Sequence, residues 1–370
     1  MTTPVRTVKP CPQPFSDHVV ANLEGVDLPI RVFPAVGSGQ EGTGTGKGKR
    51  PWLFWIHGGG FVSGKHYVPN VWVHPAFHPE GIHIVSVSYR FIPQVTLPEL
   101  WQDILLAFQW CREYLPSIVG GDGDGAVDLD RYIVGGDSAG GHLASYAGLG
   151  PEVGFDPKPT VVLDIFGVVD LTDPYISKPF DIPIQFGTDL EVLHELSTSH
   201  DASKARVTGA WTWEIEPEMS VDLLRTFWGE DYTPSDKDRL LMDLNSYLVK
   251  EGTRLDVMFR SENLSKDEFE QAKHGWSPLH RVRRSLKDDS RHRSQYPPTV
   301  VMHGRKDFVV PIKQSEEFAD RLEENGTEVL RIWSEEGGHS FEQAIGDPKE
   351  EGWKEYIQPT IAFVKKHLSL

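Results

Sequence analysis

The sequence predicts an α/β protein with a mostly parallel central sheet and helices on both faces. Short apolar runs, such as residues 52–56 and 161–166, are typical of strands that are buried on both sides. Helical patterns alternate with these runs, and in residues 98–115 apolar side chains recur every three or four positions. This alternation favours parallel strands that are joined by right-handed crossovers.

The same periodicities give the order of the expected elements. Pro98 suits the first turn of a helix, and Asn325 with Gly326 ends another helix. We expect strands at residues 17–22, 28–33, 52–56, 82–89, from 132, 161–166, 298–302 and 328–333. We expect helices at residues 98–115, from 138, 313–324 and 356–367.

The alternation of strands and helices stops between residues 170 and 275, a stretch too long to be a simple connection. We interpret residues 170–275 as a cap over the carboxyl edge of the sheet, with helices at 221–228 and 238–251. Residues 1–169 and 276–370 then form the domain that contains the sheet. The alternative is a surface insertion that covers nothing. The aromatic residues of this stretch favour a cap that binds an apolar group: Trp211, Trp213, Phe227 and Trp228.

Composition and charge exclude several classes of protein. The chain has 370 residues and a formal net charge of −17, which disfavours nucleic acid and anionic membranes as partners. Its two cysteines, Cys11 and Cys111, cannot form a disulfide framework. We find neither a signal-peptide pattern in residues 1–15 nor an apolar run of membrane-spanning length. We therefore expect a cytoplasmic protein, and leave open whether it is a homodimer.

Three motifs that suggest other ligands are rejected. The glycine-rich segment 42–48 precedes a strand and lacks the serine or threonine of a phosphate loop. Residues 122–133 lack the glycine and glutamate that a calcium loop requires. His74 and His78 have the spacing of a helical metal pair, but Pro75 and Pro79 argue against a helix there. No metal site is expected.

The turn that follows the strand beginning at residue 132 has the pattern Gly136-x-Ser138-x-Gly140. A serine in such a strand-to-helix turn has a strained backbone, and only small residues can flank it. The first amides of the helix face the same space as the hydroxyl and can stabilise a negative charge there. The pattern predicts that Ser138 is a nucleophile; the alternative is a glycine-rich turn with an incidental serine.

Two further residues complete a set that can activate a serine. The hydroxyl needs a base that takes its proton, and the base needs a carboxylate that fixes its tautomer. Asp307 and His339 each follow a predicted strand, so a parallel sheet would bring both to the edge where Ser138 lies. Alone, Asp307 could be a turn aspartate and His339 an exposed histidine. The residue types, their order in the chain and their positions after predicted strands together predict a catalytic triad of Ser138, Asp307 and His339.

A glycine-rich loop, His57-Gly58-Gly59-Gly60, follows the first buried strand. Its glycines let the backbone approach a substrate and present free amides. An amide of this loop and the amide of Ala139, the residue after the nucleophile, would form an oxyanion hole. Loss of one such donor typically costs ~3 kcal/mol of transition-state stabilisation. The alternative is a flexible hairpin.

Several motifs together resemble the hormone-sensitive-lipase-like branch of the α/β-hydrolases. These are the segments 57–61 (HGGGF), 88–90 (SYR), 136–141 (GDSAGG), 303–307 (HGRKD) and 338–339 (GH). The resemblance covers about residues 50–170 and 275–370 and implies an α/β-hydrolase fold with a helical cap insertion. It also implies an oxyanion hole and its supporting residues: Gly59, Gly60 and Ala139, with His57, Gly58 and Asp137 in support.

These residues predict a serine carboxylesterase that acts through an acyl-enzyme on a small-molecule ester with an apolar or aromatic group. No metal or organic cofactor is expected. One alternative keeps the triad but changes the bond to an amide, a lactone or a biosynthetic thioester, with hydrolysis, acyl transfer or cyclisation as the outcome. Another is a ligand-binding protein on a hydrolase scaffold, although such relatives have typically lost the histidine that is present here as His339.

Overall fold

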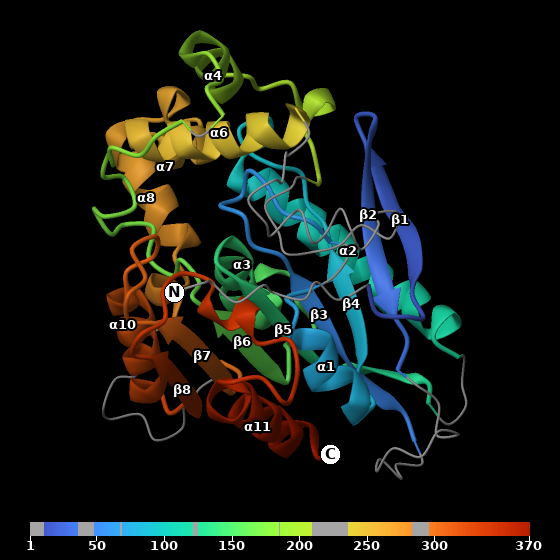
Figure 1. Cartoon of the computed structure of the whole chain (residues 1–370). Coiled ribbons are helices and arrows are strands. Elements are labelled where there is room, and N and C mark those ends of the chain that lie inside the picture. Colours follow the sequence, from blue (N-terminus) through green and yellow to red (C-terminus); the bar gives the residue numbers. More distant parts are fainter. Residues whose placement is uncertain are drawn as a thin grey trace.

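The computed structural model describes residues 11–35, 48–66, 69–120, 125–184, 186–208, 236–282 and 296–370. Within them, one eight-stranded sheet runs through the molecule in the order β1-β2-β4-β3-β5-β6-β7-β8 (Figure 1). Neighbouring strands from β4 to β8 pair in parallel, whereas β2 pairs antiparallel with β1 and with β4. The strands are β1 Ser16–Leu23, β2 Val26–Phe33, β3 Arg50–Ile56, β4 His83–Val87, β5 Val127–Asp137, β6 Val161–Ile165, β7 Thr299–Gly304 and β8 Val329–Ser334.

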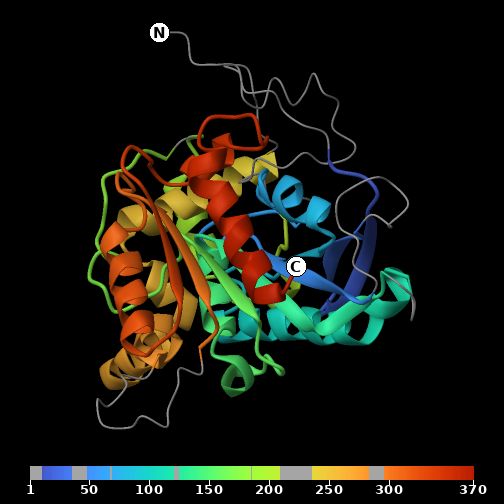
Figure 2. The ribbon, with the colours of Figure 1, turned by 90° about the horizontal axis from the view of Figure 1, so that it is seen from below.

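The predicted α/β-hydrolase fold is confirmed by this sheet and by the helices that cover it. Trp52, Phe54 and Ile56 of β3 belong to one core, and Leu53 and Trp55 belong to the other, because successive side chains of a strand point to opposite faces. The first core includes residues of α2 (Leu97–Ile118), α3 (Ala139–Ala147) and α10 (Ile312–Glu324). The second includes residues of α1 (Val73–Phe77) and α11 (Gln358–Leu368), and Figure 2 shows α11 lying across that face.

Most elements lie where the periodicity predicts them, with small differences at their ends. Helix α2 begins at Leu97, one residue before Pro98, because Thr96 and Glu99 form a capping box. The backbone N–H and hydroxyl of Thr96 donate to the Glu99 carboxylate, and the Glu99 N–H donates back to the Thr96 hydroxyl. The capping residues therefore fix the start of this helix, and the proline follows inside its first turn.

The prediction that prolines prevent a helix at His74 and His78 is wrong. Helix α1 spans Val73–Phe77 and contains Pro75 at its third position. The first turn of a helix leaves its N–H groups without intrahelical acceptors, so a proline there removes no hydrogen bond. The two imidazole rings stack with centroids 4.3 Å apart. Among the described residues, no group of three or more histidine, cysteine or acidic side chains is placed to hold a metal ion.

The chain between β6 and β7 forms a group of helices, most of which lie beyond one edge of the sheet (top of Figure 1). They are α4 Leu190–Ser197, α6 Asp236–Glu251, α7 Arg254–Phe259, α8 Lys266–Trp276 and α9 Pro278–Arg281. Helix α6 confirms the expected helix at 238–251. Several predicted features lie outside the described residues: the helix at 221–228, the aromatic residues Trp211, Trp213, Phe227 and Trp228, most of the glycine-rich segment 42–48 and the start of the segment 122–133. The division into a catalytic domain and a cap at 170–275 stays a prediction.

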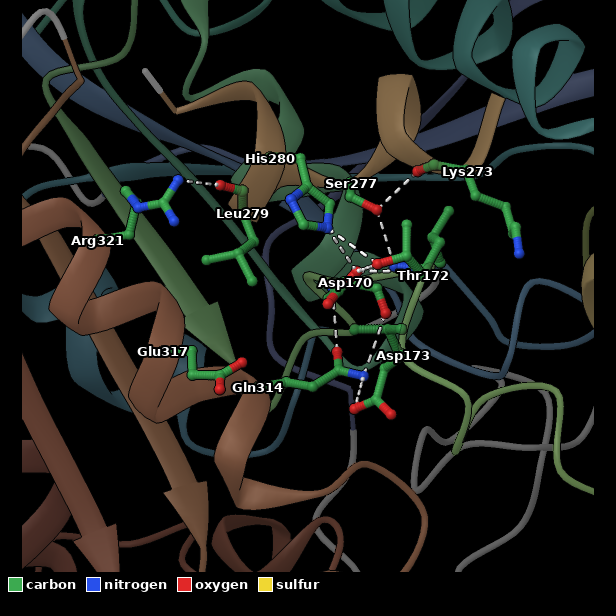
Figure 3. Close-up of polar contacts among 12 residues, drawn as sticks. Asp170, Thr172, Asp173, Lys273, Ser277, Leu279, His280, Gln314, Glu317 and Arg321 are labelled. Carbon is green, nitrogen blue, oxygen red and sulfur yellow. Dashed lines mark hydrogen bonds and ion pairs between the residues drawn. The ribbon is translucent and has the colours of Figure 1, made fainter. Parts of the chain in front are cut away.

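The two chain segments that lead into and out of this helical group are tied together at its base (Figure 3). Asp170 accepts hydrogen bonds from Thr172 and lies 3.0 Å from Nε2 of His280. Leu279 donates its N–H to the Val169 carbonyl. Gln314 of α10 adds hydrogen bonds to the N–H and carbonyl of Asp170. The outgoing and returning segments therefore meet near residues 170 and 280, close to the predicted boundaries.

Candidate active site

Ser138 lies in a tight turn between β5 and α3. Its backbone has φ 51° and ψ −114°, an unfavourable conformation for a residue with a side chain, and 8% of its surface is exposed. A Cβ on Gly140 would lie 2.0 Å from the Ile56 carbonyl oxygen, and one on Gly136 would lie 2.4 Å from the same atom. The two glycines are thus required for the close approach of β3, and the turn has the geometry of a nucleophile elbow.

The glycine loop after β3 lies directly beside this elbow. Gly58 donates its N–H to Oδ1 of Asp137 at 3.1 Å, so that amide is already used. Gly59 and Gly60 have φ values of 111° and 64°, which favour glycine. In the part of the chain that the structure describes, the amides of Gly59 and Gly60 have no acceptor. These two amides are the loop amides predicted for the oxyanion hole, and that role stays a prediction.

The buried ring of His57 packs against the glycine loop and supports it. Its ring stacks on Tyr89 with centroids 4.3 Å apart, and its Nδ1 lies 2.8 Å from the Gly58 carbonyl, to which it must donate. Burial lowers the pKa of His57 to about 4, so the ring is neutral at neutral pH. Its role is structural: the ring fills the space under the loop, where a Cβ on Gly64 would lie 2.1 Å from Nδ1.

The predicted acid and base are in direct contact. Nδ1 of His339 lies 2.7 Å from Oδ2 of Asp307, whose side chain is fully buried in the loop after β7. Because a carboxylate only accepts, Nδ1 of His339 carries the proton. Nε2 is then the nitrogen that can take a proton from a substrate or a serine, the tautomer that a triad needs.

Asp307 is held by three further donors. Its Oδ1 accepts the N–H groups of Val309 and Val310 at 2.7 and 2.9 Å, and Nε2 of His303 lies 3.0 Å from its Oδ2. Burial alone would raise the pKa of this carboxyl, but hydrogen bonds from His303 and His339 hold it well below its usual range. Asp307 is therefore a fixed, ionised acceptor for His339.

Ser138 and His339 flank one turn of the chain, after β6. The Ser138 N–H donates to the Ile165 carbonyl at 2.8 Å, and the Phe166 ring meets the His339 ring edge-on with centroids 4.7 Å apart. Among the described residues, no hydrogen bond joins the Ser138 hydroxyl to His339. Serine–histidine contacts in unliganded sites are often long and tighten when substrate binds. The structure therefore joins Asp307 to His339, whereas the contact between His339 and the Ser138 hydroxyl stays a prediction.

A buried polar chain connects the elbow with the loop that carries His339. Asn70 donates to Oε1 of Glu342 at 2.9 Å and also interacts with the Asp137 carboxyl. Burial and the nearby charge of Asp137 raise the pKa of Glu342 well above its usual range. Burial also raises the pKa of Asp137 to about 7. Sequence patterns did not point to Asn70 or Glu342, because their roles depend on contacts between distant segments.

Comparisons with known proteins agree with this fold. Residues 53–199 match a family model described as the alpha/beta hydrolase fold, and residues 242–370 match the prolyl oligopeptidase family. The chain has the α/β-hydrolase fold, and the first match confirms the resemblance to the hormone-sensitive-lipase-like branch of the α/β-hydrolases.

Individual proteins show the same relationship at low sequence identity. An α/β-hydrolase superfamily protein from Enterococcus faecalis has 13% identity and a TM-score of 0.60, over 95% of this chain and 98% of that one. A fungal esterase from Rhizomucor miehei has 18% identity and a TM-score of 0.54, over 98% and 86%. At these identities the likeness shows the fold alone.

A curated relative has a different domain context. The non-reducing polyketide synthase ascC of Acremonium egyptiacum is 26% identical over 353 residues, which cover 94% of this chain and 15% of the synthase. The match therefore covers only a small segment of the synthase. Separately, no helix in the described residues is both long and apolar enough to cross a bilayer.

Proposed function

We propose that the protein is a serine hydrolase that cleaves carboxylic esters through an acyl-enzyme. The observation that carries this proposal is the hydrogen bond between His339 and the buried Asp307, at the same side of the sheet as the Ser138 elbow. In this mechanism Ser138 attacks the ester carbonyl while Nε2 of His339 takes its proton. His339 returns the proton to the leaving alcohol, and water then repeats the sequence on the acyl-enzyme.

The free amides of Gly59, Gly60 and Ala139 would bind the oxyanion of each tetrahedral intermediate. The Gly58–Asp137 hydrogen bond supports this assignment, because it fixes the glycine loop to the residue before the nucleophile. Phe308, which follows Asp307, is 75% exposed, and its carbonyl accepts a hydrogen bond from the Tyr175 hydroxyl. These two rings could contact an apolar or aromatic substrate group.

Turnover of p-nitrophenyl esters by wild type and Ser138→Ala tests the proposal. The variant should retain the fold, measured by circular dichroism, and lose turnover, because removal of the nucleophile abolishes acyl-enzyme formation. A fluorophosphonate probe should label the wild type at Ser138. Ester turnover retained by Ser138→Ala, or a wild-type protein that reacts with neither reagent, would contradict the proposal.

The polyketide synthase relative favours one alternative from the sequence, a thioester as the natural substrate. The same acyl-enzyme chemistry applies to both bonds, since only the leaving group differs. Parallel assays with a p-nitrophenyl ester and the N-acetylcysteamine thioester of the same acid discriminate them. A kcat/KM at least tenfold higher for the thioester would favour that substrate class.

A further inference from the structure

Among the residues that the structure describes, Arg254, the first residue of α7, has no anionic partner. Its Nε atom is buried and has no hydrogen-bond acceptor. Its Nη2 atom makes one long contact, 3.4 Å, to the amide oxygen of Asn245. Within the described part of the chain, no acidic side chain forms an ion pair with it. Desolvation lowers the pKa of Arg254 to about 10, so the guanidinium still carries its charge at neutral pH.

Two other buried arginines are paired with carboxylates. Buried Arg31 lies 2.7 Å from Asp17, and buried Arg90 lies 2.8 Å from Asp103. A desolvated charge without a partner has a large free-energy cost, and such groups concentrate at functional sites. The contrast indicates that Arg254 can bind an anion that the described residues do not supply.

The position of Arg254 connects it to the predicted oxyanion loop. Its contact Asn245 lies on α6, and the amide oxygen of Asn245 is 2.9 Å from the point that a Cβ on Gly60 would occupy. Only one side chain therefore separates the guanidinium from Gly60. As a whole residue, Arg254 is partly exposed to solvent.

A guanidinium presents N–H groups in a planar fork that matches the oxygens of a carboxylate or a phosphate. We propose that Arg254 is a specificity residue that binds a carboxylate or phosphate group on the substrate, next to the oxyanion loop. This inference rests on the proposed function of Ser138. It assigns the substrate class as an acyl compound that carries a second, anionic group.

Two p-nitrophenyl esters of matched length test this inference, the hydrogen adipate and the heptanoate, each corrected for its uncatalysed rate. A phosphono analogue of the adipate distinguishes phosphate from carboxylate as the preferred group. In Arg254→Gln, the ratio of kcat/KM for the anionic ester to that for the neutral ester should fall about tenfold or more. In Arg254→Lys the same ratio should fall less, because lysine keeps the charge but lacks the planar fork of N–H groups. Arg112→Gln, which removes a surface arginine paired with Asp130, should not change the ratio.

A binding measurement separates failure of this inference from failure of the proposed function. Calorimetry with free adipate, on Ser138→Ala and on Ser138→Ala/Arg254→Gln, needs no turnover. We expect affinity about tenfold lower or more in the double variant. Equal adipate affinity in both proteins, an unchanged ester ratio, or an equal loss with both esters would overturn the assignment of Arg254. Lack of turnover in the wild type would instead contradict the esterase proposal.

Discussion

His303 and His339 both approach the same oxygen of Asp307. Nε2 of His303 lies 3.0 Å from Oδ2, and Nδ1 of His339 lies 2.7 Å from it. Nε2 of His303 also lies 2.9 Å from the Val310 carbonyl; because both neighbours are acceptors, this nitrogen carries a proton. Asp307, the predicted triad aspartate, is therefore positioned by a second, fully buried histidine.

His303→Leu should reduce kcat/KM by roughly 10- to 100-fold, because Asp307 would lose a donor that fixes its orientation. The unfolded carboxyl titrates near pH 4, above the lowered pKa in the folded protein, so Asp307 contributes stability above about pH 4 that is lost on acidification. The stability difference between wild type and variant should therefore shrink as the pH falls below about 4. Urea unfolding of both proteins over this pH range measures this difference in stability.

Ser315→Ala is the matched control for this prediction. The Ser315 hydroxyl lies 2.7 Å from Nδ1 of His303, on the side of the ring away from Asp307. Its removal leaves the donor to Asp307 in place, so kcat/KM should stay within a few-fold of wild type. A loss of activity in Ser315→Ala as large as in His303→Leu would contradict a specific effect on Asp307.

Asp137→Asn should change how stability depends on pH. The pKa of Asp137 is raised to about 7 in the folded protein, mainly by burial, against about 4 in the unfolded chain. Between these values the folded state binds more protons than the unfolded state, so this carboxyl lowers stability as the pH rises. The free energy of unfolding of the variant, relative to wild type, should increase from pH 4 to pH 7 by up to about 4 kcal/mol.

Asp130→Asn provides the comparison, because Asp130 is exposed and pairs with Arg112 at the surface. Its effect on the free energy of unfolding should be small and nearly independent of pH over the same range. If the difference between Asp137→Asn and wild type proved equally flat, Asp137 would not be a buried carboxyl with a raised pKa.

Gly140→Ala should prevent correct formation of the elbow. The added Cβ would lie 2.0 Å from the Ile56 carbonyl, so β3 and α3 would have to separate. We expect a loss of stability of about 3 kcal/mol or more and no measurable ester turnover. Gly275→Ala in α8 is the control, since no atom lies within 4 Å of its Cβ position, and it should stabilise the protein by about 0.5–1 kcal/mol. Equal melting temperatures of the two variants would refute the steric argument.

Gln314→Ala should loosen the base of the helical group between β6 and β7. The side chain of Gln314 bonds to the backbone of Asp170 and lies 3.3 Å from the Asp173 carboxylate. Its loss should cost about 1–3 kcal/mol of stability. If these helices position the substrate, KM for a bulky ester should rise several-fold while kcat changes little. Lys313→Ala, at an exposed neighbouring position, should leave both constants unchanged; similar values in the two variants would count against this role.

The sheet and the acid–base pair could be predicted from the sequence because their signals are local. Each strand is a short apolar run, and Asp307 and His339 each follow one of them. Parallel strands end at the same edge, so strand order alone brings these two residues together. The contact between them is therefore a consequence of topology and does not depend on details of packing.

Other parts of the site depend on packing between distant segments, which the sequence does not display. His303 stood in a recognised motif, but only the fold shows that its ring reaches Asp307. Arg254 and Asn245 lie in a stretch whose helical pattern could not show what it covers. Asn245 contacts Arg254 and lies beside Gly60, which is far away in the chain. The helix at Pro75 could not be predicted from its prolines, because the sequence does not show that Pro75 falls in the first turn, where a proline is tolerated.

The proposed groups follow four different strands, β3, β5, β7 and β8, and extend along the chain from residue 57 to residue 339. During synthesis from the N-terminus, the nucleophile and the oxyanion loop can pack together long before the segment with the histidine has left the ribosome. Until β8 joins the sheet, the elbow serine has no base. The appearance of esterase activity would thus report completion of the sheet, and a nascent chain arrested before β8 should be inert toward esters.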